Sequence, residues 1–182
     1  MKPVINTLIL LSLFLLSSCQ KQEVYKSKAE EIFPPVPMRN VALYRMDNSP
    51  ISPAFFQGQW SVVIFGTESC NAGCLKRLAL VNEVRQAQKL FVLAGIASHS
   101  MLTDLAKQFS NVAISMGTTP YSFDNFYAQF DSDMDMSDDK HKQIYLINSS
   151  AELAYKIDFT RLNPGDIDNE ITLLGLPPMS SR

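Results

Sequence analysis

The sequence predicts an α/β domain in three layers, with a central mixed sheet between helices and a hairpin at the amino-terminal end of the domain. Short apolar runs rich in β-branched residues alternate with helical periodicities through the middle of the chain, which predicts parallel strands joined by helices. A late pair of apolar runs around Asn148–Ala151 predicts an antiparallel hairpin at the edge of the sheet. A chain of 182 residues that is 46% hydrophobic is long enough to bury such a core.

The first elements lead from a hairpin into the central sheet. Val41–Tyr44 and Ala54–Phe56 flank the turn-rich segment Met46–Pro50 and predict the hairpin. Ser61–Phe65 predicts a buried strand, because β-branched and apolar residues dominate it. Apolar residues then recur every three positions, which predicts a helix that reaches about Gln88. The apolar face of this helix consists of Leu75, Leu78, Val81 and Val84.

The rest of the chain continues this alternation. The expected elements, in chain order, are a strand at Phe91–Ala97, a helix at Met101–Phe109, a strand at Val112–Met116, a helix at Tyr121–Phe130, a hairpin of Gln143–Ile147 with Leu153–Lys156, and a helix at Pro164–Leu174. Proline is favourable in the first turn of a helix, which supports the last of these. The order is typical of a thioredoxin-like domain, which we place at residues 40–182.

The first 39 residues predict a leader and a tether. A lysine precedes the apolar run Val4–Leu16, which is too short for a bilayer-spanning helix and has the length of the apolar region of a signal peptide. The run ends in Leu16-Ser17-Ser18-Cys19, which is typical of a bacterial lipobox, so we expect a signal peptide over residues 1–18 and lipidation of Cys19. The polar, then proline-rich residues 19–39 predict the lipidated cysteine and a flexible tether. The expected product is exported, lipid-anchored to a bacterial membrane, and facing the periplasm.

Composition argues against several classes of protein. Lys and Arg total 16 against 18 Asp and Glu, so the chain lacks the basic excess of a nucleic-acid-binding protein, and we expect no nucleic-acid partner. An aromatic content of 10% is too high for a disordered protein. Three cysteines are too few for a disulfide scaffold.

Two cysteines lie where the first core strand meets a helix. Cys70 follows the strand, and Cys74 lies at or near the helix amino terminus, where free N–H groups and the helix dipole stabilise a thiolate. The spacing puts both sulfurs within reach of each other, and Gly73 eases the geometry, so the pair can close as a disulfide or open as two thiolates. Thiolates are soft ligands that suit Cu(I). A purely structural disulfide is the alternative, although closing so small a loop gains little chain entropy.

A motif around this pair resembles that of a known family. The pattern F-G-x-x-x-C-x-x-x-C consists of Phe65, Gly66, Cys70 and Cys74. With it, the sequence resembles the Sco/SenC family, copper-delivering assembly factors for cytochrome c oxidase. The resemblance covers roughly Val41–Leu174 and includes the late strand Ile144–Ile147, while Asn71 and Leu75 stand where the family has prolines. It implies a thioredoxin-like fold, a membrane-tethered exported domain, copper bound by two cysteines and one histidine, and disulfide exchange by the same cysteines.

Two histidines are candidates for the third copper ligand. The family's histidine stands five residues before the strand tyrosine, where this chain has Lys140, and His141 lies one residue closer. The metal site implied by the resemblance is therefore Cys70, Cys74 and His141, with copper as Cu(I) or Cu(II). His99 is the alternative ligand, because it follows a core strand whose carboxyl end shares the sheet edge with Cys70.

Two functions follow from these residues. The first is a membrane-anchored Sco/SenC-like protein that passes copper to a cytochrome c oxidase subunit or to another copper or thiol protein. The second is a thiol-disulfide oxidoreductase in which Cys70 attacks as the thiolate and Cys74 resolves the mixed disulfide, with the reverse assignment also open. Oxidoreductases of this fold place a cis-proline before the late strand, and Lys140–Gln143 contains no proline, which favours the first function.

Overall fold

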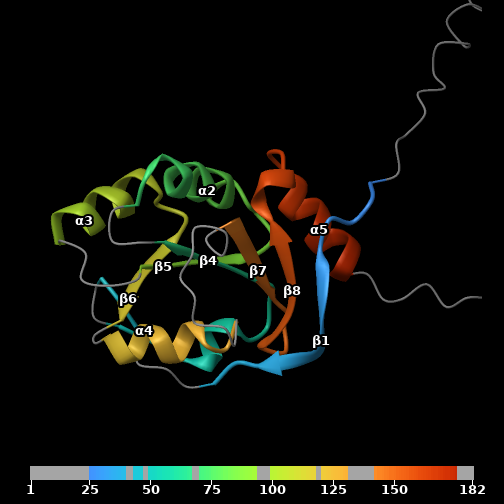
Figure 1. Ribbon diagram of the computed structural model, residues 1–182, viewed down its shortest axis with the longest axis horizontal. Helices are drawn as coiled ribbons and strands as arrows, with labels where there is room; N and C mark the ends of the chain where they lie inside the picture. The colour runs from blue at the N-terminus through green and yellow to red at the C-terminus, as the bar shows by residue number, and fades with distance from the viewer. Residues whose placement is uncertain are drawn as a thin grey trace, which may run out of the picture.

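A mixed sheet forms the middle of the domain in the computed structural model (Figure 1), which describes residues 25–39, 43–46, 49–66, 70–93, 99–117, 120–130 and 142–175. Its eight strands within these ranges are β1 (Glu30–Pro37), β2 (Leu43–Arg45), β3 (Pro50–Ile51), β4 (Ser61–Gly66), β5 (Gln88–Leu93), β6 (Ala113–Gly117), β7 (Gln143–Ile147) and β8 (Glu152–Asp158). They lie in the order β1-β8-β7-β4-β5-β6-β2-β3. Strands β4, β5 and β6 are parallel, β7 pairs antiparallel with β4, and β8 pairs antiparallel with β7. The late hairpin is antiparallel, as the sequence predicts, but β1 and not this hairpin forms that edge of the sheet.

Helices cover both faces of the sheet. These are α2 (Ala72–Asn82), α3 (His99–Gln108), α4 (Pro120–Tyr127) and α5 (Asp166–Gly175), and short 3-10 turns add η1 (Pro53–Phe56) and η3 (Phe159–Arg161). In Figure 1, α2, α3 and α5 lie on one side of the sheet and α4 lies on the other. The prediction of a three-layer, thioredoxin-like α/β domain is therefore confirmed.

Side chains of β4 alternate between the two cores that this layering creates. Val62 and Ile64 pack under α2, α3 and α5, whereas Val63 and Phe65 pack with the residues of α4. All four are at most 2% exposed. A strand that is covered on both faces needs apolar residues at consecutive positions, and Val62–Phe65 is such a run.

Several predicted boundaries differ from the structure. The second arm of the early hairpin is Pro50–Ile51, paired with β2, while Ala54–Phe56 belongs to the 3-10 turn η1, which has a proline in its first turn. Helix α2 ends at Asn82 instead of about Gln88. It stops early because the backbone N–H groups of Arg85 and Gln86 donate to the Asp168 carboxylate at 3.0–3.2 Å and not to a preceding helical turn.

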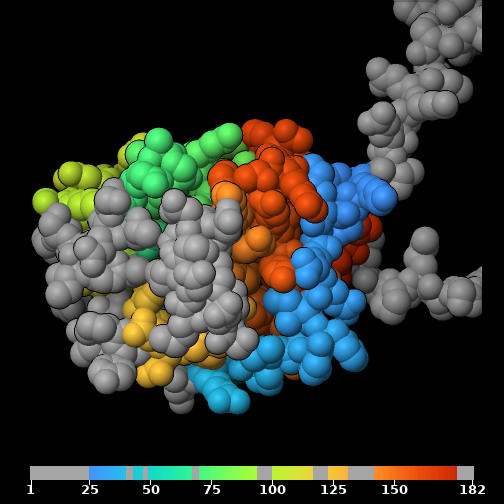
Figure 2. Space-filling model, in the orientation of Figure 1, coloured from blue at the N-terminus to red at the C-terminus, as the bar shows by residue number. Residues whose placement is uncertain are grey.

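The carboxyl-terminal part of the predicted tether is folded onto the domain. Strand β1 pairs antiparallel with β8 at the edge of the sheet, so the prediction of a tether is wrong for residues 30–37. The pairing register shifts between Glu31 and Val36, and an edge position with such an irregularity tolerates the prolines of this segment. Figure 2 shows the blue amino-terminal segment lying against the orange and red carboxyl-terminal elements. The predicted signal peptide and Cys19 lie outside the described residues.

Hydrogen bonds extend this attachment from the sheet to α5. Tyr25 Oη donates to Glu170 Oε1 at 2.8 Å, Ser27 Oγ donates to Glu170 Oε2 at 2.8 Å, and the Lys28 backbone N–H also donates to the Glu170 carboxylate. We call Tyr25, Ser27, Lys28 and Glu170 the amino-terminal clamp. Residues from Tyr25 onward thus pack on the domain, ahead of its predicted start at residue 40. No helix among the described residues is long and apolar enough to cross a membrane.

Candidate functional site

The carboxyl end of β4 is fixed by an aromatic cluster. Phe65 packs with ring centroids 4.9–6.0 Å away, mostly edge to face; its partners are Phe123, Phe126, Tyr127, Phe130 and Tyr145. Such contacts add to the energy of area burial and restrict the strand end. The backbone of Gly66, which follows Phe65 and begins the loop to the cysteines, is therefore held in a fixed position.

Gly66 allows the cysteine pair to approach this strand end. A Cβ at this position would lie 2.5 Å from the Phe91 ring and 3.2 Å from Cys74 Sγ. A residue larger than glycine would therefore displace the Phe91 ring or the Cys74 sulfur. The glycine of the F-G-x-x-x-C motif thus lets the sulfur of Cys74 lie directly against the backbone of β4.

Cys70 and Cys74 are joined by a disulfide, with Cα atoms 5.1 Å apart. Cys70 is 7% exposed and Cys74 is 2% exposed, so Cys70 is the more accessible of the two. Cys70 has a φ of +34°, a region that non-glycine residues seldom occupy and that costs on the order of 1–3 kcal/mol. The structure therefore brings together the two cysteines that the sequence pairs, in the loop and at the helix start where it places them.

Asn71 caps the helix that carries Cys74. Its side-chain Oδ1 accepts the backbone N–H of Cys74 at 3.1 Å, in an ordinary N-cap arrangement. The residue where the Sco/SenC family has a proline thus satisfies a free N–H of the first helical turn. The positive end of the α2 dipole remains directed at the cysteine pair, where it stabilises negative charge on sulfur.

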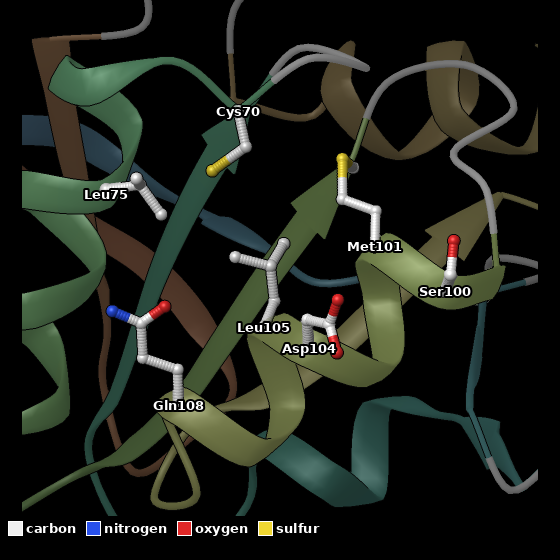
Figure 3. Close-up of a pocket in the computed structure, with 7 residues that line it drawn as sticks. All are labelled: Cys70, Leu75, Ser100, Met101, Asp104, Leu105 and Gln108. Carbon is white, nitrogen blue, oxygen red and sulfur yellow. The ribbon is translucent and has the colours of Figure 1, made fainter.

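A pocket of about 360 Å³ opens beside Cys70 (Figure 3). Its lining residues are Cys70, Leu75, Ser100, Met101, Asp104, Leu105 and Gln108. Cys70 and Leu75 lie on one side, and residues of α3 lie on the other. Leu75 is 36% exposed, so the buried face of α2 is displaced from the predicted one, and Leu75 lines the pocket instead of the core.

Arg77 is the residue of this region that the sequence reasoning missed. It is 5% exposed and lies on the face of α2 that also buries Cys74, Leu78 and Val81. Its Nη2 donates to the Phe65 carbonyl at 3.3 Å, and its guanidinium lies 5.4 Å from the centroid of the Phe159 ring. The sequence does carry a signal for it, because Arg77 is a charged residue that lies one turn after Cys74 within an apolar helical stripe.

The candidate histidines are not placed at the sulfurs by the structure. His141 lies outside the described residues. His99 is the first residue of α3, whose beginning lies at the same end of the sheet as Cys70, and its side chain is outside the described part of the molecule. Among the described residues, no group of three His, Cys, Asp or Glu side chains could hold a metal ion. The third ligand therefore remains a sequence-based prediction.

The likeness of this chain to known proteins is structural. No protein-family model matches the sequence, and no curated protein matches it either. The copper-bound crystal structure of yeast Sco1 matches with a TM-score of 0.63 and 15% identity, over 87% of this chain and 100% of that one. The chain has the fold of the Sco proteins.

Two further structures show the same likeness. A SCO1/SenC family lipoprotein from Bacillus anthracis matches with a TM-score of 0.63 and 16% identity, over 80% of this chain and 99% of that one. BsSco, a member of the Sco family of cytochrome c oxidase assembly proteins with a disulfide switch, matches with a TM-score of 0.60 and 12% identity, over 79% of this chain and 96% of that one. The shared architecture therefore spans nearly the whole of each Sco domain.

Proposed function

We propose that this chain is a divergent member of the Sco/SenC family that binds copper through Cys70 and Cys74 and delivers it in cytochrome c oxidase assembly. The position of the two cysteines carries the proposal: they lie side by side between β4 and α2, in a fold shared with copper-bound Sco structures. A pair of thiolates at a helix amino terminus is a soft, anionic donor set that suits Cu(I). The recipient is an oxidase subunit or another copper or thiol protein.

The disulfide must be reduced before copper can bind. A dithiol reductant supplies two electrons, the bond between Cys70 and Cys74 breaks, and the reductant leaves as its own disulfide. The two protons of the reductant are released when both cysteines stay ionised and hold the metal. Copper then leaves by exchange of ligands with the recipient, so the transfer itself needs no further electrons.

His141 is the proposed third ligand, with His99 as the alternative. His141 lies next to the position of the family's histidine, and a neutral imidazole complements two thiolates on Cu(I). His99 opens a helix whose first turns line the pocket beside Cys70. Single alanine variants separate the two, because only the true ligand changes the affinity for copper.

We place the protein outside the cytoplasm, held by a lipid on Cys19 and facing the periplasm. The lipobox pattern of residues 16–19 supports this placement. The Bacillus anthracis protein of the same fold is itself a lipoprotein, which agrees with it. Metabolic labelling with a radioactive or clickable fatty acid tests the anchor, since Cys19→Ser should abolish incorporation and Cys70→Ser should not.

Copper binding by the reduced full-length chain in detergent tests the proposal. A Cys19→Ser background leaves Cys70 and Cys74 as the sole thiols, because the sequence has three cysteines. We expect one Cu(I) per chain under anaerobic conditions, lost in Cys70→Ser and in Cys74→Ser, and weakened in His141→Ala. No bound copper above background would reject the proposal. Weakening in His99→Ala, with His141→Ala unchanged, would move the third ligand to His99.

One observation favours a second function, thiol-disulfide oxidoreductase. Cys70 lines an open pocket, whereas Cys74 is almost completely buried, which is the arrangement of an attacking and a resolving cysteine. In this function the Cys70 thiolate attacks a partner disulfide and Cys74 then releases the partner's thiol. Cys74→Ser should trap a mixed disulfide with the partner. Cys70→Ser serves as the control and should trap none.

A further inference from the structure

Arg77 is a buried cation without a counter-charge in the described residues. Its Nε has no hydrogen-bond partner, and no carboxylate of the described chain forms an ion pair with it. Burial lowers the pKa of the guanidinium, because the charged form is less favourable away from water. Arginine is almost never this buried unless it is paired. The Phe65 carbonyl and the Phe159 ring are its described partners, and both are neutral. A buried cation with neutral partners alone is expected to balance a negative charge that forms in another state of the site.

The cysteine pair lies on the same helix as Arg77 and can acquire that charge when it is reduced. Cys74 Sγ lies 3.2 Å from the place of a Cβ on Gly66, and Arg77 Nη2 lies 3.3 Å from the carbonyl oxygen of Phe65. The Cys74 sulfur and the guanidinium thus lie at consecutive residues, Gly66 and Phe65, at the end of β4. Cys74 and Arg77 are also three positions apart on α2, where Cβ atoms are about 5–6 Å apart.

We propose that Arg77 is a positioning residue that balances the negative charge of the cysteine pair once it is reduced and holds Cu(I). The disulfide is neutral, and the complex of one Cu(I) with two thiolates carries a net charge of minus one. A fixed cation in a medium of low dielectric constant stabilises that anion relative to the disulfide. This inference rests on the copper-binding function proposed above, and it assigns to that site a residue outside the F-G-x-x-x-C-x-x-x-C motif.

Cu(I) affinity measures the predicted effect directly. The experiment uses the reduced full-length chain in detergent with Cys19→Ser, and a colorimetric Cu(I) chelator as competitor. Arg77→Met, which keeps the bulk and removes the charge, should weaken Cu(I) binding roughly tenfold. Arg77→Lys should restore most of the affinity. Lys76→Met is the matched control, because it removes the same charge from the neighbouring exposed position, and it should change nothing.

The reduction potential gives a second readout that needs no copper. Equilibration with a dithiol buffer above the ordinary pKa of a thiol keeps both sulfurs ionised in every variant, so only the charge around them differs. Arg77→Met should shift the equilibrium toward the disulfide roughly tenfold, which lowers the potential by about 30 mV. A purely structural role would not move this quantity, because it would destabilise the oxidised and reduced forms alike.

These outcomes separate the inference from the function on which it rests. Equal affinities and potentials in Arg77→Met and the wild type, or equal shifts in Arg77→Met and Lys76→Met, would overturn the role of Arg77. Arg77→Gln carries the same expectation should Arg77→Met fail to fold. If the wild type binds no Cu(I), the proposed function fails, and the shift in potential still decides whether Arg77 acts on the pair.

Discussion

Glu170 and Arg77 are both buried charged side chains, and the molecule surrounds them in opposite ways. Glu170 is fully buried and accepts hydrogen bonds from Tyr25, Ser27 and the Lys28 backbone. Arg77 donates to one carbonyl and leaves its Nε without a partner. A buried charge with a complete set of partners contributes to one stable fold, whereas an incompletely partnered one beside a reactive group is typical of a functional site. The clamp and the cysteine site thus differ in whether their buried charge has a complete set of hydrogen-bond partners.

The largest effect is expected where the clamp is removed. Glu170→Ala leaves two hydroxyl donors and one backbone N–H without their carboxylate, so the free energy of unfolding should fall by about 3 kcal/mol. Urea unfolding followed by circular dichroism measures it. Glu31→Ala removes an exposed carboxylate from the same amino-terminal segment and should have little effect. Equal losses in the two variants would show that the clamp adds no stability.

Gly66 is the position at which a single methyl group should disturb the cysteine site. Gly66→Ala places a methyl group 2.5 Å from the Phe91 ring and 3.2 Å from Cys74 Sγ, so one of them must move. We expect a loss of about 2 kcal/mol of unfolding free energy, together with slower formation of the disulfide. Thiol titration during reoxidation measures the second effect. Gly73→Ala meets only the Oδ1 atom of Asn71, at 3.3 Å, and does not approach β4. A loss as large as that of Gly66→Ala would exclude crowding at β4 as the cause.

The clamp should also show its own pH dependence through Asp166. Burial raises the pKa of this carboxyl, but hydrogen bonds from Lys28 Nζ at 2.6 Å and the Asn163 N–H at 2.7 Å outweigh it, and the pKa lies below its usual value. A lowered pKa gives stability that is fully present above the unfolded value of about 3.9 and is lost as the pH falls through the folded value.

Asp166→Asn should therefore cost about 1 kcal/mol at neutral pH and progressively less below about pH 4. Unfolding curves of both proteins across the acid range measure the difference. A difference that stays constant as the pH falls would mean that the carboxylate charge of Asp166 contributes nothing.

The smallest effect on stability is expected at Arg77, which completes the contrast with Glu170. Replacing a buried charge that lacks a partner by an apolar side chain of similar volume is commonly neutral or stabilising. The free energy of unfolding of oxidised Arg77→Met should therefore lie within about 1 kcal/mol of the wild type. A loss as large as that of Glu170→Ala would show that the single hydrogen bond to Phe65 supports the fold, and the two regions would then not differ.

Local patterns predicted the centre of the molecule better than its edges. The β-branched run before the cysteines identified β4, and the F-G-x-x-x-C-x-x-x-C motif identified the pair, because both signals lie within a few consecutive residues. The strand β1 was missed, because prolines and charged residues in Glu30–Pro37 resemble a linker, and its partner β8 lies more than a hundred positions away. Pairing between strands so far apart in the sequence produces no hydrophobic pattern within Glu30–Pro37 that would predict a strand.

Helix α2 shows why the site was predicted only in part. A three-residue spacing selected Leu75 as a core residue, but tertiary packing buries the neighbouring face, with Cys74 and Arg77 inside and Leu75 at the pocket. The apolar stripe of a short helix is wide, and its edge is decided by what packs against it. The early end of α2 has a similar origin, because Asp168 from α5 binds the N–H groups of the following turn.

The clamp links the two ends of the described chain, and this has a consequence for the order in which the parts of the chain fold during synthesis. Tyr25 and Glu170 are separated by 145 positions, and β1 needs β8 as its partner. Contacts over such distances form late, because the entropy of closing the chain must be overcome before they add any stability. The amino-terminal segment, which follows directly behind the expected leader, therefore has no place to dock until the last helix has emerged. Until then residues 30–37 lack their partner strand, and an unpaired segment of this kind is compatible with the export proposed above.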